Sequence, residues 1–168
     1  MQIKLQIFIQ ILLHMVLATA GLCSQELLDK ERDTKLKQTV NALAQADTET
    51  LRTILSSEHQ TMSGEEAASI IKEVRRSWGD LTKLKEVDES KQEKPIGKGD
   101  MYPLVHWGTL PTHHGRWMLF RSDERNDCYL KIGLLFGNGS ADSGQLLVTE
   151  IPIPHELAPN KPDEGDGK

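Results

Sequence analysis

The 168-residue chain lacks the short motifs by which several large enzyme classes are identified from sequence. It contains no Gly-x-Ser-x-Gly turn, no phosphate-binding Gly-rich loop, no Cys-x-x-Cys pair and no His-Glu-x-x-His sequence. Enzymes that depend on these motifs are therefore disfavoured, and no cofactor is expected. A scattered pair of acid and base residues would leave no such motif, so that kind of site stays open.

The chain also lacks an excess of positive charge. Its 20 Lys and Arg residues stand against 25 Asp and Glu residues, which gives a formal net charge of −5 at pH 7, and the basic residues form no cluster. Nucleic acids and anionic membranes attract cationic surfaces. Neither is an expected partner.

No apolar run reaches the roughly 20 residues needed to cross a bilayer. The run from Leu5 to Leu17 is shorter, follows the basic residue Lys4 and leads into an Ala-Thr-Ala sequence that ends at Ala20. This arrangement is typical of a secretory signal peptide. We therefore expect cleavage after Ala20, a secreted or periplasmic protein, and no stable membrane insertion of the mature chain. Cleavage removes one Lys and no acid, which takes the formal charge from −5 to −6.

Cysteine is scarce, with Cys23 and Cys128 as the two examples. In an exported protein they can form a disulfide, and a bridge that closes a loop of roughly 100 residues would stabilise the fold by about 4 to 5 kcal/mol. Cys23 lies close to the expected mature N-terminus, where chains fray, so a free pair is an equal alternative. A lipid anchor on Cys23 is disfavoured because Leu22, and not a small residue, precedes it.

The first half of the mature chain has the periodicity of three amphipathic helices. The first carries an apolar stripe formed by Leu36, Val40, Leu43 and Ala44. Asp47 is a candidate N-cap for the second helix. The third has a capping box, Ser63 and Glu66, and ends at Gly79. Each helix therefore has one face that must pack against another layer.

The second half consists of short apolar runs separated by Gly, Pro, Asn and Asp, which predicts five strands. They span residues 81–87, 102–109, 116–121, 129–136 and 145–151. Short turns connect the last three strands, which are expected to pair antiparallel in sequence order. The second and third strands are expected to form a β-hairpin around the turn between Leu110 and Gly115. Helices followed by strands indicate an α+β fold, with N-terminal helices packed on one face of a curved antiparallel sheet.

The expected organisation is a single domain, because about 150 residues remain after cleavage and that length supports one core. The signal peptide covers residues 1–20 and a flexible lead-in covers 21–33. The α+β domain covers 34–151. The remaining residues, 152–168, form a proline- and charge-rich tail that is expected to be disordered.

The expected hairpin sequence between His106 and Phe120 holds three of the six histidines and two of the three tryptophans. A metal site is disfavoured there because the adjacent His113 and His114 point in different directions in an extended chain. His106 is a candidate general base if a carboxylate such as Glu86, on a neighbouring strand, orients it. A histidine bonded to a main-chain carbonyl is the simpler interpretation.

The order of a helix, a second helix in "ADTETLRTILSS", a third in "MSGEEAASIIKEVRRSWGDL" and a run of antiparallel strands resembles small exported members of the NTF2-like (cystatin-like cone) superfamily over residues 34–151. The specific points are "ALAQADTETLRTIL", similar to the step from the first helix into the second, and Trp78-Gly79 before the first strand. The resemblance implies a sheet curved into a cone against the helices, often with a pocket at its wide end. It also implies either an acid/base isomerase or dehydratase, or a non-catalytic binding or assembly module. The chain matches no catalytic Asp or His pattern of the enzymatic branches, so no catalytic residue carries over.

The leading expectation is an exported, non-enzymatic domain that holds a small apolar molecule or a protein partner on the concave face of the sheet. The candidate binding residues are His106, Trp107, Trp117, Phe120 and Tyr129. One alternative is an isomerase- or lyase-type enzyme that uses His106 with a carboxylate. A second is an interaction or inhibitor module that adds an edge strand to a partner. A homodimer is left open.

Overall fold

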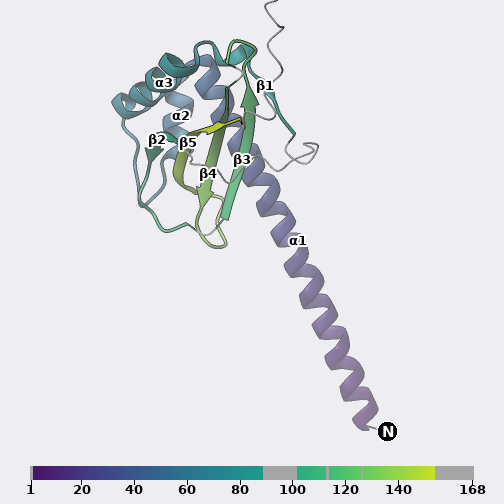
Figure 1. Cartoon of the computed structure of the whole chain (residues 1–168). Coiled ribbons are helices and arrows are strands. Elements are labelled where there is room, and N and C mark those ends of the chain that lie inside the picture. Colours follow the sequence, from purple (N-terminus) through teal and green to yellow (C-terminus); the bar gives the residue numbers. More distant parts are fainter. Residues whose placement is uncertain (1, 89–101, 113, 126, 154–168) are drawn as a thin grey trace, which may run out of the picture.

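A computed structural model describes residues 2–88, 102–112, 114–125 and 127–153, with side chains from Ser24 onward, Tyr102 excepted. Three helices come first: α1 (Gln2–Gln45), α2 (Thr48–Leu55) and α3 (Gly64–Trp78). A short 3-10 helix, η1 (Leu81–Lys83), leads into five strands. These are β1 (Lys85–Glu86), β2 (Tyr102–Trp107), β3 (His114–Arg121), β4 (Cys128–Phe136) and β5 (Ser143–Pro152) (Figure 1). The predicted α+β order of helices followed by strands is confirmed.

The predicted helix caps are present in the structure. The Asp47 carboxylate accepts a hydrogen bond from the Thr50 main-chain N–H and so caps α2. At the start of α3, the Ser63 hydroxyl accepts from the Glu66 N–H while the Glu66 carboxylate accepts from the Ser63 N–H. Gly79 ends α3 with φ +69°, a conformation that glycine adopts without a steric penalty.

The five strands form one antiparallel sheet in the order β1-β3-β4-β5-β2. Strands β3, β4 and β5 pair in sequence order, as predicted. The predicted hairpin of β2 with β3 is wrong, because β2 pairs with β5 at the far edge of the sheet. The Gln60 side chain explains this placement: it accepts from the Thr109 N–H (3.0 Å) and donates to the Gly144 carbonyl (3.1 Å). These bonds hold the chain that leaves β2 beside the start of β5.

The strand predicted over residues 81–87 is correct only at its end. Asp80 caps a 3-10 turn over Leu81–Lys83, and its carboxylate accepts from both the N–H and the hydroxyl of Thr82. Only Lys85 and Glu86 then pair with β3. The local hydrogen bonds of an Asp side chain compete with a ladder in this way.

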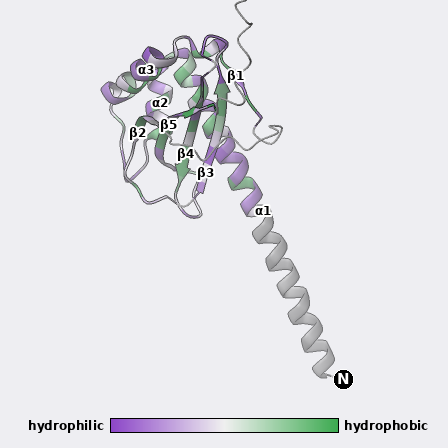
Figure 2. Cartoon of the chain, in the orientation of Figure 1, coloured by the Kyte–Doolittle hydropathy of each residue, from purple (hydrophilic) through white to green (hydrophobic). Residues whose placement is uncertain are grey.

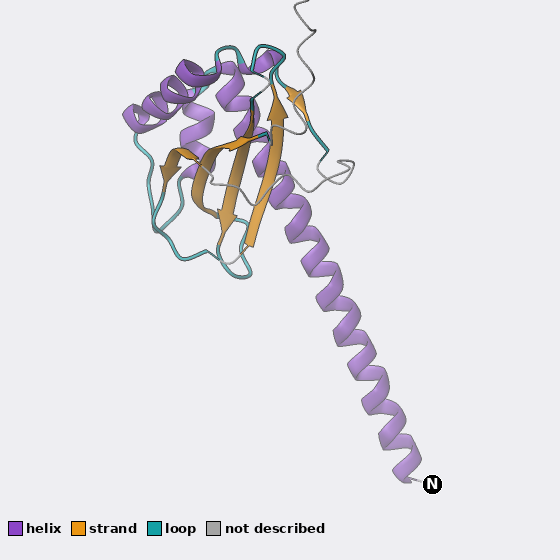
Figure 3. Cartoon of the chain, viewed as in Figure 1, coloured by secondary structure: helices purple, strands orange, loops and turns teal. Residues whose placement is uncertain are grey.

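All three helices lie on one face of the sheet (Figure 3). Helix α1 contacts β3 and β4, α2 contacts β5, and α3 contacts β2. The core between them contains Leu43, Leu51 and Val74 from the helices and Leu130, Leu134 and Leu146 from the strands, none of which is exposed to solvent. In Figure 2 the strands are largely coloured as hydrophobic while α3 shows many hydrophilic residues. The side of the sheet that packs against the helices is called the helix-covered face below, and the opposite side is called the open face.

Both ends of the predicted domain differ from the structure. The residues expected as a lead-in, 21–33, belong to helix α1, whose N-terminal part extends away from the sheet (Figure 1). Arg32 is 1% exposed and donates twice to the Ser140 carbonyl, at 2.9 and 2.7 Å, so packing begins before residue 34. Strand β5 extends to Pro152, and the buried Ile153 donates its N–H to the Asp127 carbonyl. The rest of the predicted tail, 154–168, lies outside the described residues.

Candidate functional site

The most unusual surface feature is Trp117, a large aromatic residue that is 43% exposed in the middle of β3. Its cross-strand partner on β4 is Gly133, and Gly115 lies two residues before it. A Cβ atom at Gly133 would stand well inside 3.0 Å of the benzo-ring atoms Cε3 and Cζ3, and one at Gly115 would lie 2.8 Å from Cζ2. The indole therefore rests across the main chain of two strands, at a place where any larger residue would displace it.

A groove of about 460 Å³ lies beside this ring. It is lined by Glu86, Val87, Asp88, Trp117, Met118, Leu119 and Lys131. The Lys131 ammonium lies 4.6 Å from the centroid of the Trp117 ring, close enough for a cation–π interaction. The groove thus joins the end of β1, the middle of β3 and one side chain of β4.

The floor next to Trp117 is apolar and packed. Leu119, Tyr129, Ile151 and Ile153 form a second buried cluster on the open face, and Val87 packs against it. The Val87 N–H also donates to the Leu119 carbonyl at 2.8 Å, which extends the pairing of β1 with β3 by one residue. This cluster fixes the strands that carry the ring, so the site is largely preformed.

Both signs of charge line the groove beside the ring, because Lys131 contributes a cation while Glu86 and Asp88 contribute carboxylates. Cross-strand pairing places Arg121 on the same face as Trp117, and it places Glu86 opposite Phe120, on the helix-covered side. In the part of the chain that the structure describes, neither Lys131 nor Arg121 forms an ion pair.

The structure separates the five residues predicted to bind a ligand. Trp107 and Phe120 lie on the helix-covered face and pack in the main core. His106, Trp117 and Tyr129 lie on the open face, but β4 and β5 separate His106 from Trp117. Tyr129 is 7% exposed and belongs to the apolar floor. Of the five, Trp117 alone combines exposure with a groove.

The less favoured alternative for His106, orientation by Glu86, is not present in the structure, and the partner of the ring is a side-chain amide and not the main-chain carbonyl of the simpler interpretation. His106 is exposed on β2, and its Nε2 atom lies 3.3 Å from the Oε1 atom of Gln145, a neutral partner. Glu86 lies on β1, at the opposite edge of the sheet. No carboxylate therefore orients this histidine among the described residues.

Cys128 carries a free, buried thiol. Its burial raises the pKa of this thiol to about 12, and the nearby Asp127 carboxylate acts in the same direction, while the Arg125 cation opposes them. A thiol with so high a pKa is a poor nucleophile near neutral pH. The side chain of Cys23 lies outside the described residues, so the predicted bridge stays a prediction.

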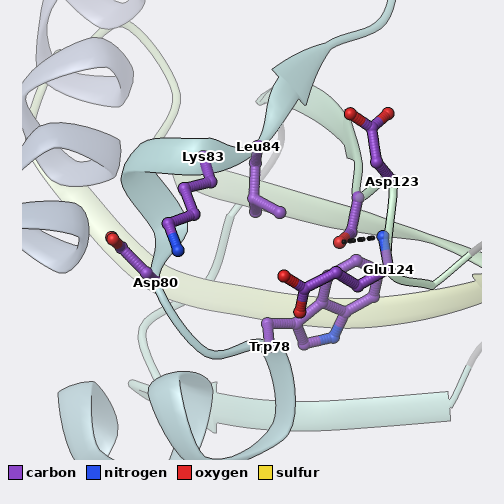
Figure 4. Close-up of a pocket in the computed structure, with 7 residues that line it drawn as sticks. Trp78, Asp80, Lys83, Leu84, Asp123 and Glu124 are labelled. Carbon is purple, nitrogen blue, oxygen red and sulfur yellow. Dashed lines mark hydrogen bonds between the residues drawn. The ribbon is translucent and has the colours of Figure 1, made fainter.

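A second pocket, of about 150 Å³, lies at the end of the domain where α3 leads into η1 (Figure 4). Its lining residues are Trp78, Asp80, Lys83, Leu84, Ser122, Asp123 and Glu124. The aromatic and charged side chains of this pocket already have partners within the protein. The Trp78 Nε1–H donates to Glu150 at 2.7 Å, the Arg125 guanidinium lies 4.6 Å from the indole ring, and Asp123 pairs with Lys85 at 2.6 Å. We assign this pocket to the joint between α3 and the sheet.

Neither a metal site nor a membrane span is found among the described residues. No group of three or more His, Cys, Asp or Glu side chains among them is placed to hold a metal ion. No helix in this part of the chain is both long and apolar enough to span a membrane. No family model matches the chain, and no curated protein or solved structure matches it.

The sequence reasoning found Trp117 but missed the residues that make it a site. Gly133, which makes room for the ring, and Lys131, which lies over it, were not singled out. A signal was present, because a glycine inside a strand often marks the close approach of another group. Gly115, Trp117 and Gly133 fall inside predicted strands or at their edges, but only the strand register shows that one ring crosses both glycines.

Proposed function

We propose that the protein is a non-enzymatic binding domain that uses the open face of its sheet to hold a protein partner, with Trp117 as the central contact. The observation that carries this proposal is the exposed indole held flat on Gly115 and Gly133. Tryptophan is among the residues that contribute most to protein interfaces, and large exposed aromatic groups mark such surfaces.

The helix-covered face offers a less suitable place for a ligand. Leu130, Ile132 and Leu134 of β4 are at most 1% exposed beneath the helices. A small apolar molecule between the helices and the sheet would have to displace this packed core, which has the character of a protein interior. The open face requires no such displacement, and its shallow groove suits a protein surface.

The energy available at Trp117 is consistent with a central contact. A buried Trp side chain covers 150 to 250 Å², so the exposed 43% corresponds to roughly 100 Å². Covering this area would contribute about 2.5 kcal/mol at 25 cal/mol per Å². Removing the ring is therefore expected to weaken binding by about 50-fold.

An acid/base enzyme and strand addition at the β2 edge fit the structure less well. An acid/base enzyme that uses His106 lacks the carboxylate that would orient it. A partner strand added at the edge of β2 would lie beside Pro103, which has no N–H to donate, and beside a register shift between Pro103 and Val105. Both features are devices that natural sheets use to block pairing at an edge.

We also propose that the protein is exported, which the basic start, the apolar run and the Ala-Thr-Ala site support. Membership of the NTF2-like superfamily is likewise a proposal, supported by three helices that precede an antiparallel sheet.

Native mass spectrometry of protein isolated from its own host tests these proposals. The expected result is a mature chain that begins at Gly21 and a complex with a protein partner, which Trp117→Ala dissociates. The control is Leu27→Ala, which removes the other large exposed hydrophobic side chain among the described residues and should leave the complex intact. A complex that survives Trp117→Ala would refute the assignment of the open face.

A further inference from the structure

We propose that the partner binds as an extended peptide strand, which pairs with the outer edge of β3 beyond the end of β1, where no described strand pairs, and places an apolar side chain against Trp117. This inference rests on the proposed function, because it specifies how a protein partner occupies the same groove.

The outer edge of β3 is covered only in part. Strand β3 has eight residues, from His114 to Arg121, whereas β1 pairs with Arg121 and Phe120. The bond from the Val87 N–H to the Leu119 carbonyl is the last contact of this pairing. Within the described residues, no strand pairs with that edge of β3 from His114 to Met118.

The alternation of an antiparallel ladder identifies the groups on this free edge. Successive residues of a strand direct their main-chain groups to opposite neighbours. Leu119 directs its carbonyl towards β1, so Trp117 directs its N–H and C=O to the same side, as does Gly115. The Gly115 carbonyl already has a contact at 3.4 Å with the Arg116 guanidinium. Trp117 therefore offers a donor and an acceptor with the spacing that only another polypeptide main chain matches.

The side chain of Trp117 adds selectivity to this edge. In an antiparallel pair, directly opposite residues point to the same face of the sheet. The peptide residue opposite Trp117 therefore meets the indole ring on the open face. Because the ring lies down on Gly115 and Gly133, it leaves the edge clear and presents a flat apolar surface to that residue.

Charge selects the kind of peptide. Lys131 and Arg121 lie on the open face without an ion pair among the described residues, and Lys131 extends over the indole. An acidic residue two positions from the apolar one would lie on this face and meet the ammonium group.

Titrations monitored by NMR, with short synthetic peptides as probes, test the proposal on the full mature protein. The first probe is Ac-Thr-Val-Thr-Glu-Thr-NH2, whose Val and Glu side chains share one face of a strand. The second carries an N-methyl group on Val, which removes the main-chain donor and keeps every side chain. The third replaces Glu with Lys. We expect the first probe to bind with a Kd of about 1 mM and the other two to bind at least about tenfold more weakly.

The variants separate this inference from the proposed function. Trp117→Ala should weaken binding of the first probe by at least about tenfold, and Leu27→Ala should leave the affinity for this probe unchanged. Equal binding of the N-methylated probe would overturn strand addition but would leave Trp117 as a contact. Binding that is unaffected by Trp117→Ala would overturn both. Failure of the first probe to bind, or sedimentation of the free protein as a dimer that Trp117→Ala dissociates, would also overturn the peptide proposal.

Discussion

Replacing Gly133 with Ala tests the geometry on which the binding site depends. The new Cβ atom would stand well inside 3.0 Å of the Trp117 ring, so either the ring or the two strands must move. The ring is 43% exposed and can swing outward, whereas β4 is paired on both sides. Gly133→Ala is therefore expected to displace the indole and leave the sheet intact.

The expected loss of stability depends on the fact that the ring moves and the strands do not. Inserting a methyl group into a packed site costs about 1 to 3 kcal/mol, and a ring that can move outward places the cost near the lower end. When residue 117 is Ala, the collision no longer exists. Gly133 does not have a positive φ, so in that background the same change should stabilise by about 0.5 to 1 kcal/mol, because alanine restricts the unfolded chain.

The effect of Gly133→Ala should thus change sign with residue 117. A double-mutant cycle over the wild type, both single variants and the double variant should give a coupling energy of about 2 kcal/mol. Urea unfolding followed by far-ultraviolet circular dichroism measures it without relying on tryptophan emission. Gly64→Ala is the matched control, since a Cβ there has nothing within 4 Å, and its effect should not depend on residue 117. An equal cost of Gly133→Ala in both backgrounds would refute the proposed position of the ring.

Three further predictions concern the buried polar groups. Arg32→Ala should lower the free energy of unfolding by about 2 to 4 kcal/mol, because it removes a buried side chain and leaves the part-buried Ser140 carbonyl without its donor, whereas Arg52→Ala at an exposed ion pair should change the urea midpoint little. The pKa of the Cys128 thiol is about 12 in the folded protein and about 9.0 in the unfolded chain. The protonated thiol therefore contributes to stability fully below pH 9.0, and this contribution is lost as the pH rises towards 12. Its reaction with Ellman's reagent at pH 8 should therefore be far slower in the native than in the urea-unfolded protein, and equal rates would contradict this. Thr149→Val should raise the unfolding free energy by about 1 kcal/mol, because the buried Thr149 hydroxyl has no hydrogen-bond partner among the described residues, and a loss of stability would contradict this.

The local structure was accessible from the sequence because its causes are local. Capping by Asp47 and by Ser63 with Glu66 depends on residues three positions apart, and the structure has both caps. The three strands joined by short turns were predicted in the correct order for the same reason. Such features follow from side-chain chemistry within a few residues of the chain.

The position of β2 was not accessible in this way. Val105 and Trp107 lie on either side of the polar His106, a pattern that fits pairing with β3 and with β5 equally well. Pairing with β5 is supported by Gln60, which lies more than 40 residues before β2. Its side chain bonds both to Thr109, just after β2, and to Gly144, at the start of β5. A single side chain that bridges two distant segments leaves no periodic signal. The Trp107 Nε1–H, 3.4 Å from Glu66 of α3, is a second contact of this kind.

The same error explains why the five candidate residues do not share one face of the sheet. A hairpin of β2 with β3 would have brought Trp107 close to Trp117, and an aromatic pocket would have followed from their proximity. Pairing with β5 turns Trp107 towards the helices and leaves Trp117 on the open face. Once the helices fill one side of the sheet, a binding function has to use the other side or an edge. Trp117 belongs to the open face and to an edge. Its ring lies on the open face, and its main-chain groups point to the part of the β3 edge that β1 does not pair with. Strand register, more than composition, therefore determines which aromatic side chains of this sheet reach the solvent.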